Sequence, residues 1–212
     1  MNYAFLGTRQ PRLLPTPVLD FYRNAASSLA KQGSCIVSGA TPGAEQLAAE
    51  AALHAGGNVE LFLPWALYER EWVQRIKRQF AEQVHETVFN PTTHAHWLRE
   101  ARAMVPNGEN LSMGSISLHA RCYGMLERAG AVVVLPYVRL TWQVIERTSD
   151  FRRSKIGGIS SESQVRERTL DKGGMEWPIR FAQTLERDSF DLSTEEDRVR
   201  LLRAIQDPVY TD

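Results

Sequence analysis

The sequence has little cysteine, no excess of either charge and no long apolar run. Its two cysteines, Cys35 and Cys122, are typical of reduced buried thiols rather than of a disulfide-stabilised scaffold. Its 25 basic and 25 acidic residues balance to a formal charge of zero, which argues against a protein that coats nucleic acid by charge alone. No run of about 18 apolar residues and no N-terminal basic-plus-apolar signal is present, so we expect a cytoplasmic protein with no membrane partner.

Several catalytic and cofactor motifs are also missing. There is no Walker loop, no Gly-x-Ser-x-Gly and no Cys-x-x-Cys. The Gly-x-Gly-x-x-Gly fingerprint is absent too, which argues against a hydride-transferring dehydrogenase. His94, His96 and His119 invite a metal interpretation, but alternate helical residues point opposite ways and no acidic or cysteine partner has ligand spacing. We therefore expect neither a metal nor a cofactor.

Two short segments carry most of the positive information: Asn2-Tyr-Ala-Phe-Leu-Gly-Thr-Arg9 and Cys35-Ile-Val-Ser-Gly-Ala-Thr-Pro-Gly-Ala-Glu45. In each, a short apolar run typical of a buried strand leads into a glycine-containing turn and then a helix. Such a turn directs backbone N–H groups and a helix N-terminus at one point, which is how folds of this type hold phosphate. Two such turns on neighbouring strands predict one composite anion site.

The order of elements predicts an α/β fold, a Rossmann-like parallel sheet with helices on both faces. Over the first 60 or so residues, strands and helices alternate in the pattern that requires right-handed crossovers between parallel strands. We expect strands at 2–6, 35–37, 59–63, 131–135 and 189–192. We expect helices at 17–32, 45–55, 69–84, 92–102, 115–128, 177–185 and 194–205.

Composition predicts one domain over residues 1–212, since 43% apolar and 24% charged residues are ordinary globular values. Residues 139–172 are polar and charged, and we interpret them as an excursion from this domain rather than a second core. Their basic residues, among them Arg152, Arg153 and Lys155, indicate either a solvated loop or a nucleic-acid-binding lip.

The two glycine turns are similar to those of the Rossmann-like core of DNA-processing protein A, a mediator of single-strand-DNA recombination. That core belongs to the SLOG superfamily, with the lonely-guy phosphoribohydrolases and domains that sense nucleotides. Three further segments resemble the superfamily in order and spacing: Leu118-His-Ala-Arg-Cys122, Asp171-Lys-Gly-Gly-Met-Glu-Trp177, and Arg180-Phe-Ala with Phe190-Asp-Leu192. The resemblance implies a nucleotide or single-stranded DNA as partner, and a homodimer.

The resemblance to the hydrolases breaks at one motif. The lonely-guy enzymes carry Pro-Gly-Gly-x-Gly-Thr-x-x-Glu with a catalytic glutamate, whereas here Gly173-Gly174 is followed by Met175-Glu176-Trp177. No glutamate stands in register, so catalysis is an open question, and Glu45 and Glu176 are the only candidates for a catalytic carboxylate.

The candidate site collects the turn glycines, their polar neighbours and one helix arginine. Each has a plainer alternative: glycines for positive φ, hydroxyls for local capping, Arg9 for solvation, and Glu45 for a favourable place at a helix N-terminus. An arginine fork suits bidentate phosphate contact, which favours Arg9 and Arg121 as ligands. The nucleotide- or phosphate-binding candidates are Gly7, Thr8, Arg9, Ser38, Gly39, Ala40, Gly43, Glu45, Arg121, Gly173 and Gly174.

Three functions remain open at this point. The first is a binding protein that grips the phosphates of single-stranded DNA or a free nucleotide with little base readout. The second is an N-glycosidase acting on a nucleoside monophosphate, with Glu45 or Glu176 stabilising the ribosyl cation. The third is a nucleotide sensor or interaction protein whose crevice has lost its ligand.

Overall fold

The computed structural model describes residues 1–9, 11–135, 140–147, 163–170, 176–192 and 194–206. The chain divides into two units, one formed by Met1–Tyr137 with Gly174–Asp212 and the other by Val138–Gly173.

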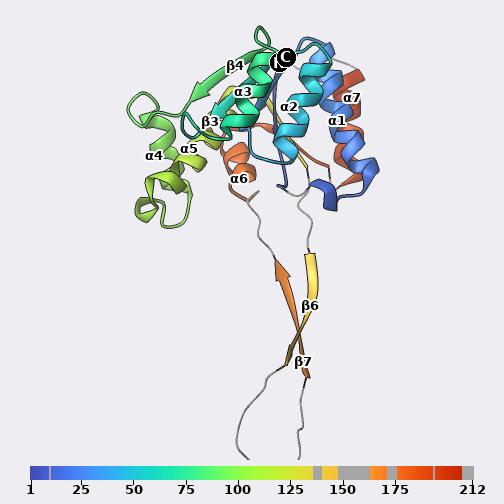
Figure 1. The fold of residues 1–212 in the computed structure, drawn as a ribbon, viewed down its shortest axis with the longest axis vertical. Helices are drawn as coiled ribbons and strands as arrows, with labels where there is room; N and C mark the ends of the chain where they lie inside the picture. The colour runs from blue at the N-terminus through green and yellow to red at the C-terminus, as the bar shows by residue number, and fades with distance from the viewer. Residues whose placement is uncertain (10, 136–139, 148–162, 171–175, 193, 207–212) are drawn as a thin grey trace, which may run out of the picture. The chain divides into compact units, whose positions relative to one another are not determined.

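The first unit is built on a six-stranded sheet in the order β4-β3-β2-β1-β5-β8, and every pair of neighbouring strands is parallel (Figure 1). Its strands are β1 (Asn2–Leu6), β2 (Cys35–Ser38), β3 (Val59–Leu63), β4 (Val84–Val88), β5 (Ala131–Val134) and β8 (Asp188–Asp191). Ala4 lies between Val37 of β2 and Val132 of β5, so the most apolar strands occupy the centre of the sheet. The predicted parallel α/β sheet is confirmed.

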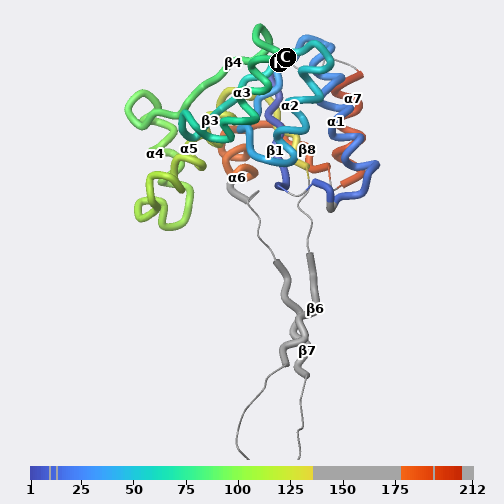
Figure 2. The backbone as a smooth tube through the Cα atoms, in the orientation of Figure 1, coloured from blue at the N-terminus to red at the C-terminus, as the bar shows by residue number. Residues whose placement is uncertain are grey.

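Helices cover both faces of this sheet, as the tube in Figure 2 also shows. Side chains alternate along β1, so Tyr3 and Phe5 pack on one face while Ala4 and Leu6 pack on the other. The first face carries α1 (Thr16–Lys31), α2 (Ala44–His54), α3 (Arg70–Gln79) and α7 (Glu195–Gln206). The second face carries α4 (Ala95–Met104), α5 (Met113–Arg128) and α6 (Glu176–Thr184). Short 3-10 turns, η1 (Pro11–Leu13) and η2 (Gly108–Asn110), precede α1 and α5.

One predicted element was wrong. The helix expected over residues 69–84 ends at Gln79, and the next residues return to the sheet as the edge strand β4. Within β4 only Val84 is buried, so its sequence lacks the apolar signal of a central strand. Pairing with β3, Val59 opposite Val84 through Leu63 opposite Val88, is what makes this segment a strand.

The second unit contains two antiparallel strands, β6 (Leu140–Arg147) and β7 (Ser163–Leu170), with Leu140 opposite Leu170 and Arg147 opposite Ser163. No strand was predicted here, because this segment is rich in charged residues and its β-branched residues are few by comparison. Arg152, Arg153 and Lys155 lie outside the described residues.

Candidate functional site

The strand order reverses at the centre of the sheet. From β1 the chain steps outward to β2, β3 and β4, whereas β5 and β8 lie on the other side of β1. In open parallel sheets such a switch point leaves a crevice at the carboxyl ends of the strands, where ligands bind. Gly7 stands directly after β1 at this point. A Cβ on Gly7 would lie 2.6 Å from the Cβ of Ala44 and 2.7 Å from that of Leu135, so only glycine permits this close packing.

The turn after β1 (residues 7–9, the β1 turn) meets the turn after β2 (residues 39–43, the β2 turn). The amide of Ala44 donates to the carbonyl of Thr8 at 3.0 Å. Gly43 has a φ of 103°, and a Cβ there would lie 2.6 Å from the carbonyl oxygen of Thr8. The structure therefore brings Gly7, Thr8 and Arg9 together with Gly43, and leaves the side chain of Arg9 exposed.

The β2 turn satisfies much of its own polar backbone. The hydroxyl of Ser38 accepts from the amide of Ala40 at 3.2 Å and donates to the carbonyl of Glu45 at 3.2 Å. A carboxylate oxygen of Glu45 accepts from the amide of Thr41 at 3.1 Å. These two amides are thus already bound within the protein. A ligand at this turn must depend on other donors.

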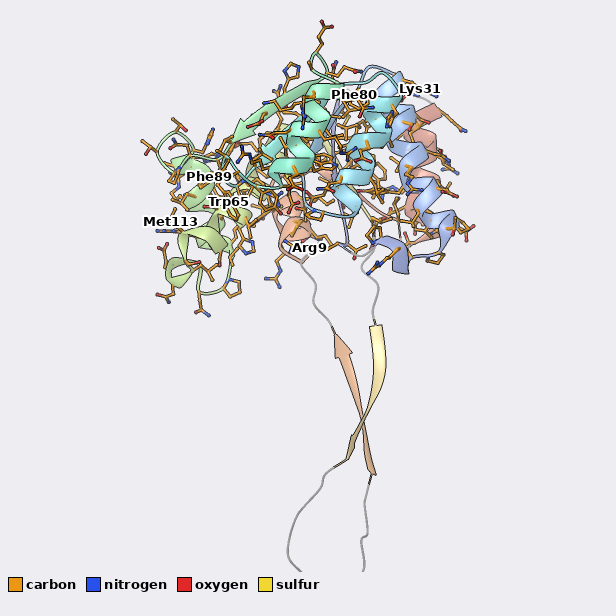
Figure 3. The ribbon with its side chains drawn as sticks, in the orientation of Figure 1. Arg9, Lys31, Trp65, Phe80, Phe89 and Met113 are labelled. Carbon is orange, nitrogen blue, oxygen red and sulfur yellow. The ribbon has the colours of Figure 1, made fainter. Side chains whose placement is uncertain are left out.

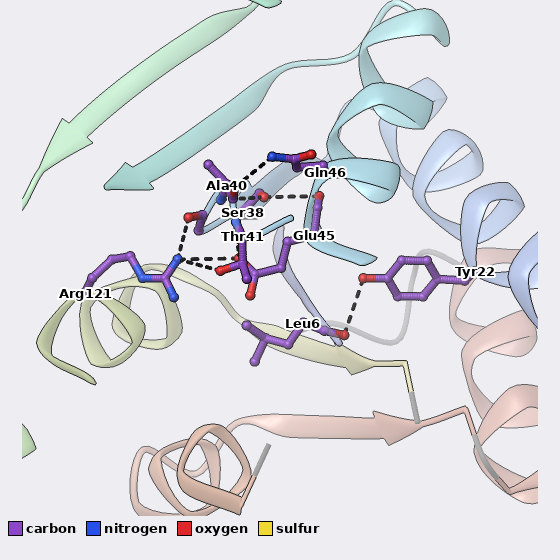
Figure 4. Close-up of polar contacts among 9 residues, drawn as sticks. Leu6, Tyr22, Ser38, Ala40, Thr41, Glu45, Gln46 and Arg121 are labelled. Carbon is purple, nitrogen blue, oxygen red and sulfur yellow. Dashed lines mark hydrogen bonds and ion pairs between the residues drawn. The ribbon is translucent and has the colours of Figure 1, made fainter. Parts of the chain in front are cut away.

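Arg121 of α5 supplies such donors. Only 6% of the residue is exposed, and its Nη1 donates to the carbonyl of Gly39, to Thr41 Oγ1 at 3.2 Å and to Glu45 Oε2 at 3.5 Å (Figure 4). Its Nε is buried and has no hydrogen-bond partner among the described residues. A Cβ on Gly39 would collide with Nη1, so this glycine makes room for the guanidinium. Arg121 is therefore anchored by one nitrogen, and further N–H groups are left over.

Burial shifts the pKa values of three groups around the site, Tyr22, Cys122 and His119. Burial, and then the negative charge of Glu45, raise the pKa of Tyr22 well above its usual range. Burial raises the pKa of the Cys122 thiol to about 12. Burial and the charge of Arg121 lower the pKa of His119, which favours its neutral form. The site is thus suited to holding an anion by fixed charge and hydrogen bonds.

Two aromatic residues outside the predicted set, Trp65 and Tyr68, extend the site. They belong to the turn after β3 (residues 64–69, the β3 turn). The guanidinium carbon of Arg121 lies 5.9 Å from the ring centre of Tyr68, and Trp65 meets Tyr68 edge to face at 5.2 Å. Trp65 is 41% exposed. Their position in the turn after the third predicted strand was the sequence signal that could have identified them.

The remaining candidates are dispersed. Gly173 and Gly174 lie outside the described residues, and Glu176 is the first residue of α6. His94 stacks on the ring of Trp97 at 4.1 Å, whereas His96 contacts Glu127 Oε1 at 2.6 Å.

No cluster of three or more His, Cys, Asp or Glu side chains suited to a metal occurs in the described ranges. In the same ranges, none of the helices is both long and apolar enough to span a bilayer.

No family model matches this sequence, and no curated protein matches it. Solved structures do match. DNA processing protein A from Helicobacter pylori, a structure described for its unique single-stranded DNA binding mode, is 19% identical with a TM-score of 0.53. The match covers 100% of this chain and 79% of that one.

Two weaker likenesses accompany it. DNA processing protein A from Streptococcus pneumoniae is 15% identical with a TM-score of 0.45, covering 95% of this chain and 56% of that one. The protein TM1055 is 16% identical with a TM-score of 0.36, covering 63% of this chain and 59% of that one. The chain thus has a Rossmann-like fold similar to that of DNA processing protein A.

Proposed function

We propose that this chain, whose fold is similar to that of DNA processing protein A, binds single-stranded DNA through its phosphates. The binding site is the carboxyl edge of the sheet, where the β1 turn and the β2 turn meet. The structural neighbour from Helicobacter pylori, described for single-stranded DNA binding, supports this choice of ligand.

The observation that carries the proposal is the guanidinium of Arg121. It is buried and held at the β2 turn by Gly39, Thr41 and Glu45, yet its Nε has no partner among the described residues. A buried N–H without a partner costs roughly 1–3 kcal/mol, a cost that a phosphate oxygen would remove once the guanidinium turned toward it. Exposed Arg9 on the adjoining β1 turn offers a second cation to the same strand.

The test is the affinity of an Arg9→Ala variant for a labelled oligonucleotide of ~20 residues, measured by fluorescence anisotropy at two salt concentrations. Because Arg9 is exposed, the variant folds, and we expect binding weaker by about 1–3 kcal/mol. Arg99→Ala is the matched control, since it removes the same charge from an exposed α4 residue paired with Glu100. Unchanged affinity in folded Arg9→Ala would contradict the assigned site.

The hydrolase alternative depends on Glu45, whose buried carboxylate lies 3.5 Å from the nearest nitrogen of Arg121. That carboxylate already accepts from Arg121 and the amide of Thr41, so its main role is to hold the β2 turn. We expect no free base to be released from a panel of nucleoside monophosphates. Release that is lost in Glu45→Gln would favour the glycosidase instead.

A further inference from the structure

A groove lies beside α3. It has a volume of about 520 Å³, and its walls are the β3 turn, one face of α3 and the edge strand β4. Three cations line it: Arg70, Lys77 and Arg78. The one acidic residue that lines it, Glu86, is bound by Lys77 at 2.8 Å, so the lining keeps a net positive charge.

Contacts within the β3 turn link the candidate site to the groove. Arg121 contacts Tyr68, and Tyr68 contacts Trp65 within the same turn. Ala66 and Leu67 then form the near end of the groove, and Leu67 is 66% exposed. Trp65 and Arg9, both labelled in Figure 3, each follow the carboxyl end of a parallel strand, so they belong to the same edge of the sheet.

The spacing of the cations fits an extended polyanion better than a small one. Arg70 begins α3 and Arg78 lies eight positions later, which places them about 12 Å apart along the helix axis. The positions 70, 74, 77 and 78 share one helix face. A single phosphate group cannot reach both ends of such a face, whereas a polynucleotide backbone presents a charge at every residue.

We infer that the α3 groove (Arg70, Lys77 and Arg78 with the β3 turn) is the path along which single-stranded DNA continues beyond the phosphate held near Arg121. This inference rests on the proposed function and deepens it, because it makes the ligand a strand of several nucleotides. Trp65 is exposed in the β3 turn, between Arg121 and the α3 groove. Its ring can stack on a base, a contact that tolerates any sequence.

The experiment compares two oligothymidylates, one of ~4 and one of ~20 nucleotides, on a double variant Arg70→Ala/Arg78→Ala. Both side chains are exposed, so the double variant folds, which its circular dichroism checks. We expect the affinity for the longer strand to fall about tenfold or more and the salt slope to drop by about 1.4, since each lost contact with a single strand removes about 0.7. Affinity for the shorter strand should stay unchanged.

Arg75→Ala is the matched control. Arg75 belongs to the same helix and is exposed, but it pairs with Glu50 at 2.6 Å and is not among the residues that line the groove. We expect Arg75→Ala to bind both strands as the unmodified protein does. An equal loss in Arg75→Ala and the double variant would overturn the path and indicate a general field effect.

The remaining outcomes separate the groove from the proposed function. If the double variant binds both strands normally while Arg9→Ala does not, the path along the α3 groove is refuted and the proposed function stands. If it loses affinity for both strands equally, its cations act at the crevice, and the path is likewise overturned. If the unmodified protein binds neither strand, the proposed function fails and the groove fails with it.

Discussion

The β2 turn and the β3 turn occupy equivalent positions in the fold but are built differently. Each joins the carboxyl end of a parallel strand to a helix on the same face of the sheet. The β2 turn is largely buried, and its amides, Ser38, Glu45 and Arg121 bond one another. The β3 turn instead exposes Trp65, Ala66 and Leu67. The β2 turn is thus held by hydrogen bonds among its own groups and Arg121, whereas the β3 turn leaves apolar side chains open to solvent.

Removing Arg121 gives the largest expected loss of stability. In Arg121→Ala the carboxylate of Glu45 stays buried without its cation, which we expect to lower the free energy of unfolding by about 3–5 kcal/mol. Urea denaturation followed by circular dichroism measures this change. The control is Arg128→Ala on the same helix, whose exposed pair with Glu60 should contribute about 1 kcal/mol or less. Similar losses in both variants would mean that the buried pair of Arg121 with Glu45 stabilises the protein no more than the pair of Arg128 with Glu60 does.

Gly43→Ala tests whether the β1 and β2 turns need their close approach. An alanine at a φ of 103° is strained, and its Cβ would press on the carbonyl of Thr8. We expect a loss of about 1–3 kcal/mol in the free energy of unfolding, with weaker DNA binding.

Gly114→Ala is the matched control for that variant. Apart from its chain neighbours and the backbone of its own helix, a Cβ at Gly114, near the start of α5, would meet no atom within 4 Å, so we expect no loss of stability there. A stable Gly43→Ala protein with normal affinity would show that the turns tolerate separation.

Stability at alkaline pH tests whether the thiol of Cys122, next to Arg121 in α5, is closed to water. Because burial raises the pKa of Cys122 from 9.0 to about 12, the unfolded thiol ionises first as the pH rises. The stability that the protonated thiol contributes is fully present below about pH 9 and is lost as the pH rises from 9 to 12. At pH 10.5 the loss amounts to about 2 kcal/mol. Urea midpoints at pH 8 and 10.5 measure it. Cys122→Ala should lose about 2 kcal/mol less than the unmodified protein over this interval, and equal losses would indicate an accessible thiol.

Trp65→Ala should have the smallest effect on stability and a clear effect on binding. The ring is 41% exposed and makes one edge-to-face contact with Tyr68, so we expect a stability change of about 1 kcal/mol or less. Affinity for a ~20-nucleotide strand should fall by about 1–3 kcal/mol, the value of one stacked base. Met113→Ala, which truncates an exposed apolar side chain of α5, is the control and should leave affinity unchanged. A large stability loss without a binding loss would assign Trp65 to the core.

Local pattern was enough to predict the central strands and most helices. Short apolar runs ending at glycine or proline predicted β1, β2 and β3, and β3 has the same bounds in the structure. These segments are buried on both faces of the sheet, so their residues carry a strong signal. The edge strand β4 and the pair β6 and β7 lack that signal, since their partners in the sheet define them more than their composition does.

The candidate site divides in the same way. Gly7, Gly39 and Gly43 were predicted because a tight turn after a parallel strand needs residues without side chains. This requirement is local, so the glycines are visible in the sequence itself. The pairing of Glu45 with Arg121 joins positions 76 residues apart, and the contact of Arg121 with Tyr68 brings in a third strand. The sequence alone determined where the chain turns. Which buried charges face one another was decided by the packing of α5 across the sheet, because an ion pair forms only where tertiary contacts bring its partners together.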